Sequence, residues 1–270
     1  MENTSPFYWT KSMDVGTRHP IIARISAGIP RLLDLWEVSK EMKQQVQNYC
    51  YDIAIDLIEA EKNSLPVINE IEEIEAKLKV LNPSTLPKSI DSVINIQCTR
   101  SFFKFSKAAL EKLAVVLGLV FEKKFSKPKF KDIINELAKT FPDSAEEEYL
   151  ILSILRHYQP FADKLIELRN REEHPHKKGE EFVNNYKVIN LDGNLILERP
   201  SFIGNIPVLD YLKNAIYLLL HFIEESLVAS ISLNLHPIVG IYDIPLEKRD
   251  PKFPRRFVLC LPGHTLGGNI

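Results

Sequence analysis

The stretch LRNREEHPHKKG, residues 168–179, gathers residue types that can act on a phosphodiester. Arg169, Asn170, His174 and His176 all fall within this stretch, at the end of a long helical pattern. An arginine guanidinium stays charged and its planar fork matches phosphate oxygens. Histidine titrates near neutral pH, so it can take or give a proton. The same residue types also cap an ordinary helix end, because cations there complement the helix dipole.

A long helix should position this stretch. Asp143 and Ser144 can cap it, and three glutamates then fall in its first turn, where the helix dipole favours anions. Pro160 is expected to bend it. Its buried stripe consists of Phe161, Leu165 and Leu168. Pro175 disfavours the α conformation at His174, so we expect the helix to end there, with His174 off its end and close to Arg169.

Two amphipathic patterns lie nearer the N-terminus. Apolar residues recur at steps of three and four from Val38 to about Ser64, before Pro66, and again from Val67 to Leu81. We expect two helices that pack as a hairpin. The stretch NPSTLPKS, residues 82–89, has the composition of a loop and is the best internal boundary.

The segment after this loop should form the centre of the fold. Residues 107–121 are apolar nearly all round, which is typical of a central core helix. A lysine-rich loop then leads to a short helix over residues 129–139. Strand alternation on both sides of Asp192-Gly193 predicts a β-hairpin.

The last strong helical pattern runs from Val208 to about Ile231. It carries a second apolar face, so we expect it to pack inside the fold and also against a second subunit; that face consists of Tyr211, Ala215, Leu218 and Phe222. The tail from His236 includes one strand-like run, residues 257–261, and should lie along the surface.

Composition excludes several classes of protein. The 270 residues are 45% hydrophobic and 26% charged, which is typical of an ordinary globular chain. A net charge of −2 gives no general attraction to nucleic acid, so any polyanion would need a local basic patch. Three distant cysteines without CxxC spacing indicate reduced thiols and a cytoplasmic protein. We expect neither a secretory signal nor a membrane span.

With these elements in place, the chain resembles the HEPN superfamily of small helical domains. The family's hallmark is an Arg, usually followed by a polar residue such as Asn, and a His after four to six intervening residues; Arg169, Asn170 and His174 match it with four between. The resemblance covers roughly residues 90–235. It implies an all-α, HEPN-like helical bundle over residues 87–235 with a β-hairpin insertion. Residues 1–86 would be an N-terminal helical extension and residues 236–270 a tail packed on the domain.

The resemblance also implies a function. Many family members are homodimeric, metal-independent endoribonucleases of toxin-antitoxin and other defence systems, whereas others only bind RNA or protein. We therefore expect RNA as the substrate, a homodimer, an antitoxin or defence protein as a possible partner, and no cofactor. Arg169, Asn170 and His174 would be the catalytic residues. His176 with Arg171 also satisfies the spacing and is the alternate pair.

Lysines near the motif are the candidate RNA contacts. Lys177 and Lys178 directly follow it. The loop over residues 123–131 carries five lysines, among them Lys124 and Lys127, with interleaved phenylalanines that can stack on bases. A solvated loop anchored by its phenylalanines is the competing interpretation. No further ligand completes a metal site around the two histidines, so we expect no bound metal.

Overall fold

The protein is described here by a computed structural model covering residues 15–80, 95–125, 127–141, 149–174, 182–191, 194–236 and 238–260. These residues are predominantly helical, with small antiparallel sheets, as the sequence predicted. The loop expected at residues 82–89 and the helix cap expected at Asp143 and Ser144 lie outside the described residues.

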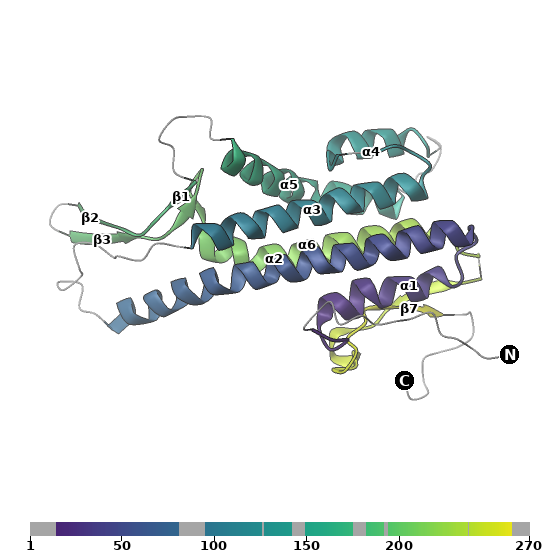
Figure 1. Cartoon of the computed structure of the whole chain (residues 1–270), viewed down its shortest axis with the longest axis horizontal. Helices are drawn as coiled ribbons and strands as arrows, with labels where there is room; N and C mark the ends of the chain where they lie inside the picture. Colours follow the sequence, from purple (N-terminus) through teal and green to yellow (C-terminus); the bar gives the residue numbers. More distant parts are fainter. Residues whose placement is uncertain are drawn as a thin grey trace.

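Four long helices form the body of the molecule (Figure 1). Helices α3 (Ile96–Val120) and α6 (Val208–Ser232) pack against each other, and each also packs against α2 (Lys40–Val80) and α5 (Leu150–Glu173). The short α4 (Phe130–Ala138) lies on α5. The sequence predicted α4 and α6 to within one residue, and α3 begins earlier than the core segment that was expected.

Helix α2 corrects the expected helical hairpin. One continuous helix passes through Pro66, where two helices were predicted. Buried residues recur at steps of three and four on both sides of the proline, at positions 53, 57, 60, 64, 67 and 71. Just before it, the Ser64 hydroxyl donates to the Glu61 carbonyl oxygen at 2.8 Å and the Asn63 amide to the Glu59 carbonyl oxygen at 2.7 Å. Packing of this stripe on α3 and α6 outweighs the roughly 3 kcal/mol that an interior proline costs.

Three small sheets complete the fold. Strands β1 (Val183–Asn184), β4 (Ser201–Phe202) and β5 (Ile206–Pro207) form one sheet in the order β1-β4-β5. The predicted hairpin is confirmed as the antiparallel pair β2 (Lys187–Leu191) and β3 (Asn194–Glu198), in which Leu191 pairs with Asn194. The turn expected at Asp192-Gly193 lies outside the described residues. The predicted strand of the tail, β7 (Phe257–Cys260), pairs with β6 (Gly240–Asp243).

Short helical segments flank this last hairpin. The π-helical turn η1 (Ile22–Ser26) and α1 (Gly28–Leu33) precede α2, and the 3₁₀ turn η3 (Leu246–Lys248) lies between β6 and β7. Helix α1 contacts α6 and β7, so the first and last described segments lie together on one side of the bundle. In Figure 1 they are seen below α2 and α6.

The hydrophobic core is one cluster that runs through every long helix. It includes Ile21 near the start of the described chain and Ile231 at the end of α6. The core is therefore continuous across the boundary expected at residue 86, and α2 is an integral part of the bundle. The apolar face of α6 that was assigned to a second subunit packs within its own chain instead: Ala215 and Phe222 are buried, and Tyr211 and Leu218 pack against the core.

Helix α6 also differs from expectation in its hydropathy. It is the one helix of the described chain long and apolar enough to cross a membrane, although no such run was predicted. Of its most apolar 18-residue window, 67% is buried inside the protein. A buried core helix of a soluble protein can have the same length and hydropathy, so these two properties of α6 are weak evidence for a membrane span.

Candidate functional site

The Arg-Asn-His motif spans the C-terminal end of α5. The helix ends at Glu173, and His174 follows with φ −129° and ψ 76°, outside the helical region. The His174 N–H still donates to the Asn170 carbonyl oxygen at 2.9 Å, which fixes the residue against the last turn. Leu165 and Leu168 are fully buried and anchor this end of the helix in the core. The expected helix end, with His174 directly beyond it, is confirmed. The His174 side chain is exposed there.

Arg169 lies in the last turn of α5 and is held by an acidic partner. Its guanidinium contacts the Glu173 carboxylate one turn later. The Arg169 side chain is 14% exposed, whereas that of Glu173 is 42% exposed. The guanidinium is therefore fixed in place by packing, and the carboxylate that covers it faces solvent.

Helix α3 contributes a cation to the motif. The Lys107 ammonium donates to the Asn170 side-chain oxygen at 3.3 Å and lies 3.8 Å from the Glu111 carboxylate. Arg100, about two turns earlier on the same face of α3, contacts Glu172 at 2.6 Å. Two basic residues of α3 thus reach the end of α5.

These α3 residues were missed in the sequence, although a signal was present. Arg100, Lys104 and Lys107 are spaced by four and three, which places three basic residues on one helical face. The sequence around Lys107 does not predict its contact with Asn170, because that contact depends on how α3 packs against α5.

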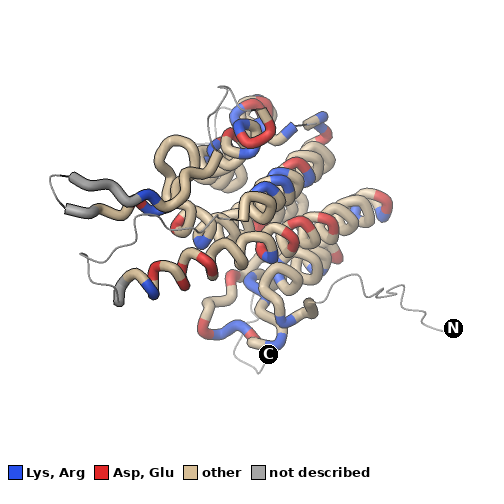
Figure 2. Tube along the Cα trace, turned by 60° about the vertical axis from the view of Figure 1, so that its left-hand side comes forward, with Lys and Arg blue, Asp and Glu red and all other residues tan. Residues whose placement is uncertain are grey.

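Each arginine around the motif has a glutamate partner. Besides the pairs of Arg169 and Arg100, Arg171 contacts Glu167 at 2.9 Å. Hydrogen bonding from Lys164, with the charges of Lys164 and Arg171, lowers the pKa of Glu167, so this carboxylate stays ionised. Figure 2 shows basic and acidic positions interspersed along the helices. The end of α5 is therefore rich in charge but close to neutral.

The other candidate residues divide into two groups. His176, Lys177 and Lys178 lie outside the described residues. Lys124 and Lys127 are exposed in the segment after the C-terminal end of α3. Lys107, which touches the motif, is 13 residues before the end of that helix, or about 20 Å along its axis. The structure does not bring Lys124 and Lys127 to the motif.

Chemically, the arrangement offers a fixed guanidinium, an amide and an imidazole on one exposed helix end. In the described part of the chain, no group of three or more His, Cys, Asp or Glu side chains lies together as a metal site would require. No protein-family model matches the sequence, and no curated protein or solved structure is significantly similar to it.

Proposed function

We propose that this protein is an endoribonuclease of HEPN type that cleaves RNA without a metal ion. The observation that carries the proposal is the placement of the motif. Arg169 lies in the last turn of α5, and His174 is the first residue beyond the helix, anchored to Asn170. In this arrangement an always-charged guanidinium and an exposed imidazole sit on the same end of a rigid element, where a phosphodiester can approach both.

The reaction we propose is attack by the ribose 2′-oxygen on the adjacent phosphorus. A histidine takes the 2′-OH proton, the bond from phosphorus to the 5′-oxygen breaks, and an acid protonates the leaving 5′-oxygen. The products are a 2′,3′-cyclic phosphate and a 5′-OH. Arg169 stabilises the charge that develops on the phosphorane, and Asn170 with Lys107 orients the phosphate.

The chemistry also calls for a dimer. It needs a base and an acid, and the motif of one chain supplies His174 for one of these roles. A two-fold dimer that opposes two α5 ends supplies two histidines and two arginines to one cleft. We therefore propose a homodimer as the active form, acting within a toxin or defence system.

One observation favours a second function, a HEPN-like module that binds RNA or a protein partner without cleaving. Arg169, Arg171 and Arg100 are each neutralised by a glutamate. A phosphate that binds Arg169 has to displace the carboxylate of Glu173. A protein partner can instead contact the arginines and glutamates together and leave these ion pairs intact. Activity measurements separate the two functions.

The test is incubation of the purified full chain with a pool of structured RNA in EDTA, followed by gel analysis. We expect cleavage by the wild type, and a loss of at least about 100-fold in Arg169→Ala and in His174→Ala, the size of a lost proton-transfer group or oxyanion contact. His157→Ala is the matched control, because His157 is an exposed histidine on the same helix, away from the motif.

Two outcomes contradict the nuclease proposal. One is cleavage that persists in His174→Ala at the wild-type rate. The other is the absence of cleavage by the wild type together with RNA binding that Arg169→Ala weakens, which establishes the binding module instead.

A further inference from the structure

Helix α3 presents a row of basic residues beside the end of α5. We call Arg100, Lys104 and Lys107 the α3 basic face, because their spacing of four and three residues places them on one side of the helix. Arg100 contacts Glu172 at 2.6 Å, and the Lys107 ammonium donates to the Asn170 side-chain oxygen at 3.3 Å. Both contacts are with the last turn of α5, so the α3 basic face borders the Arg-Asn-His motif.

Lys104 lies between these two contacts along α3 and is exposed. Within the described parts of the chain, its ammonium contacts no carboxylate. The contact it does make is with the ring of Phe105, whose centroid is 5.6 Å away. Lys104 can therefore bind an anionic group of a ligand without first giving up an ion pair.

The basic face gives this surface an excess of positive charge. From Lys164 to Glu173, α5 carries three cations and three carboxylates, so its end is balanced. From Ile96 to Glu111, α3 carries the three cations of the basic face and one carboxylate, Glu111, which lies 3.8 Å from Lys107. The next cation of α3, Lys112, contacts Asp56 of α2 at 2.6 Å. With every carboxylate of both stretches counted, two positive charges remain in excess.

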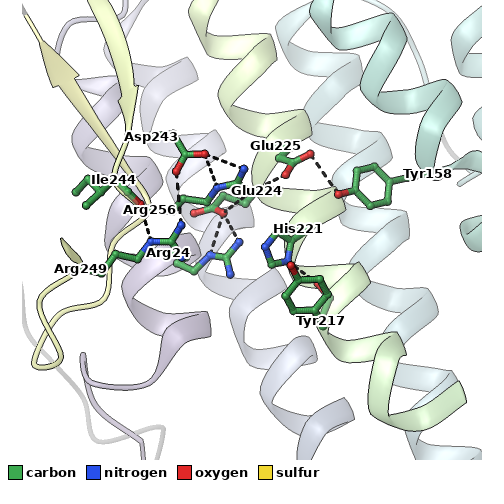
Figure 3. Close-up of polar contacts among 10 residues, drawn as sticks. All are labelled: Arg24, Tyr158, Tyr217, His221, Glu224, Glu225, Asp243, Ile244, Arg249 and Arg256. Atoms are coloured by element: carbon green, nitrogen blue, oxygen red, sulfur yellow. Dashed lines mark hydrogen bonds and ion pairs between the residues drawn. The ribbon is translucent and has the colours of Figure 1, made fainter. Parts of the chain in front are cut away.

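A second group of arginines, at the β6–β7 hairpin, shows the opposite balance (Figure 3). Three arginines there contact three carboxylates: Arg24, Arg249 and Arg256 against Asp243, Glu224 and Glu225. Glu224 and Glu225 belong to α6, so these ion pairs hold the hairpin and the η1 turn on that helix. Their charges are used within the fold, and the α3 basic face is the better candidate for a polyanion.

The length of the α3 basic face fits a short piece of nucleic-acid backbone. Arg100 and Lys107 are seven residues apart, or about 10 Å along the helix. A nucleic-acid strand places a phosphate about every 3.4 Å along its axis, so this length faces roughly two or three consecutive phosphates. Lys107 already contacts the motif, and Lys104 and Arg100 follow it along α3 away from Asn170.

We propose that the α3 basic face holds the RNA backbone next to the phosphate that is cleaved. The strand runs along α3 from Lys107 towards Arg100, and Lys104 contacts the phosphate that neighbours the scissile one. This inference rests on the proposed function, because the polyanion it names is the substrate of that site. Lys104 acts as a positioning residue, since its contact is with the backbone and carries no sequence information.

The test is fluorescence anisotropy of a labelled single-stranded RNA of about ten nucleotides, measured over a range of salt concentrations. All variants carry His174→Ala, which prevents cleavage. Each phosphate contact with a single strand contributes about 0.7 to the slope of log affinity against log salt concentration. We expect Lys104→Gln to reduce the magnitude of this slope by about 0.7. Lys104→Arg keeps the charge and should leave the slope unchanged.

Lys40→Gln is the matched control. Lys40 is also an exposed helical lysine that contacts no carboxylate within the described parts of the chain. It is the first residue of α2, and α2 begins at the other end of the bundle from the last turn of α5 (Figure 1). An unchanged slope in Lys104→Gln, an equal reduction in Lys40→Gln, or no RNA binding by any variant overturns the proposal.

The result for this surface can be told apart from the result for the nuclease. Cleavage by the chain with His174 intact, together with an unchanged slope in Lys104→Gln, refutes the α3 contact and leaves the nuclease proposal standing. A reduced slope in Lys104→Gln, together with no cleavage by the wild type, supports the α3 contact and refutes the nuclease proposal.

Discussion

At the scale of single residues, the Glu173 carboxylate stands where an RNA phosphate is proposed to bind. We expect Glu173→Gln to tighten RNA binding roughly two- to fivefold, since exposed ion pairs are worth about 0.2–1 kcal/mol. The measurement is fluorescence anisotropy of labelled RNA in a His174→Ala background, which prevents cleavage. Glu136→Gln is the control, because this exposed glutamate on α4 pairs with Lys139 and the variant changes the net charge equally. Weaker binding by Glu173→Gln would argue that RNA does not use Arg169.

His221 gives a prediction for pH. Burial lowers its pKa below the ordinary value of 6.5, so the folded chain binds this proton less readily than the unfolded chain does. The free energy of unfolding should therefore fall as pH drops below about 6.5, and this contribution should disappear in His221→Gln. Urea unfolding at about pH 7.5 and about pH 5.5 measures it. His157→Gln should follow the wild type, and an identical pH dependence in His221→Gln would contradict the account.

What the sequence predicts at this scale is limited to local geometry. The effect of Pro175 on His174 acts through one peptide bond, so the helix end was predictable. The contact between Lys107 and Asn170 joins residues 63 positions apart and depends on the packing of α3 on α5. The same holds for Arg24 and Glu224, which are 200 positions apart.

At the scale of elements, Pro66 is the signal that misled the prediction. Pro66 and Pro160 both lie inside helices, at exposed positions, and the helices continue through them, as was expected for Pro160 but not for Pro66. The sequence favours a break at Pro66 because the ring removes a helical hydrogen bond. The stripe of buried residues on both sides of it belongs to one face, and only its burial against α3 and α6 shows that the helix is continuous. Elements bounded by their own turn residues, such as β2 and β3, were predictable.

This gives a prediction for stability. Pro66→Ala should raise the free energy of unfolding by about 1–2 kcal/mol, because the restored hydrogen bond exceeds the loss of proline's constraint on the unfolded chain. Urea denaturation of the purified protein measures it, with Pro160→Ala as a second case expected to change in the same direction. A lower free energy of unfolding in Pro66→Ala would mean that the helix needs the proline's geometry.

At the scale of the whole molecule, the helical N-terminal region and the bundle share one core. Helix α2 packs along both α3 and α6, so its removal exposes their buried faces. We expect a chain of residues 87–270 to lack a cooperative thermal transition by circular dichroism, whereas the full chain has one. A shortened chain that unfolds cooperatively near the melting temperature of the full chain would show that residues 1–86 are a separable extension.

The central claim is that the end of α5 cleaves RNA through the 2′-oxygen. The most direct measurement is the chemistry of the product ends, obtained from RNA incubated with the full chain in EDTA. The account predicts a 2′,3′-cyclic phosphate and a 5′-OH from the wild type, at least about 100-fold less product from His174→Ala, and no cleavage where the attacking 2′-OH is replaced by hydrogen. Products with a 5′-phosphate, or cleavage of the 2′-deoxy substrate at the same rate, would contradict it.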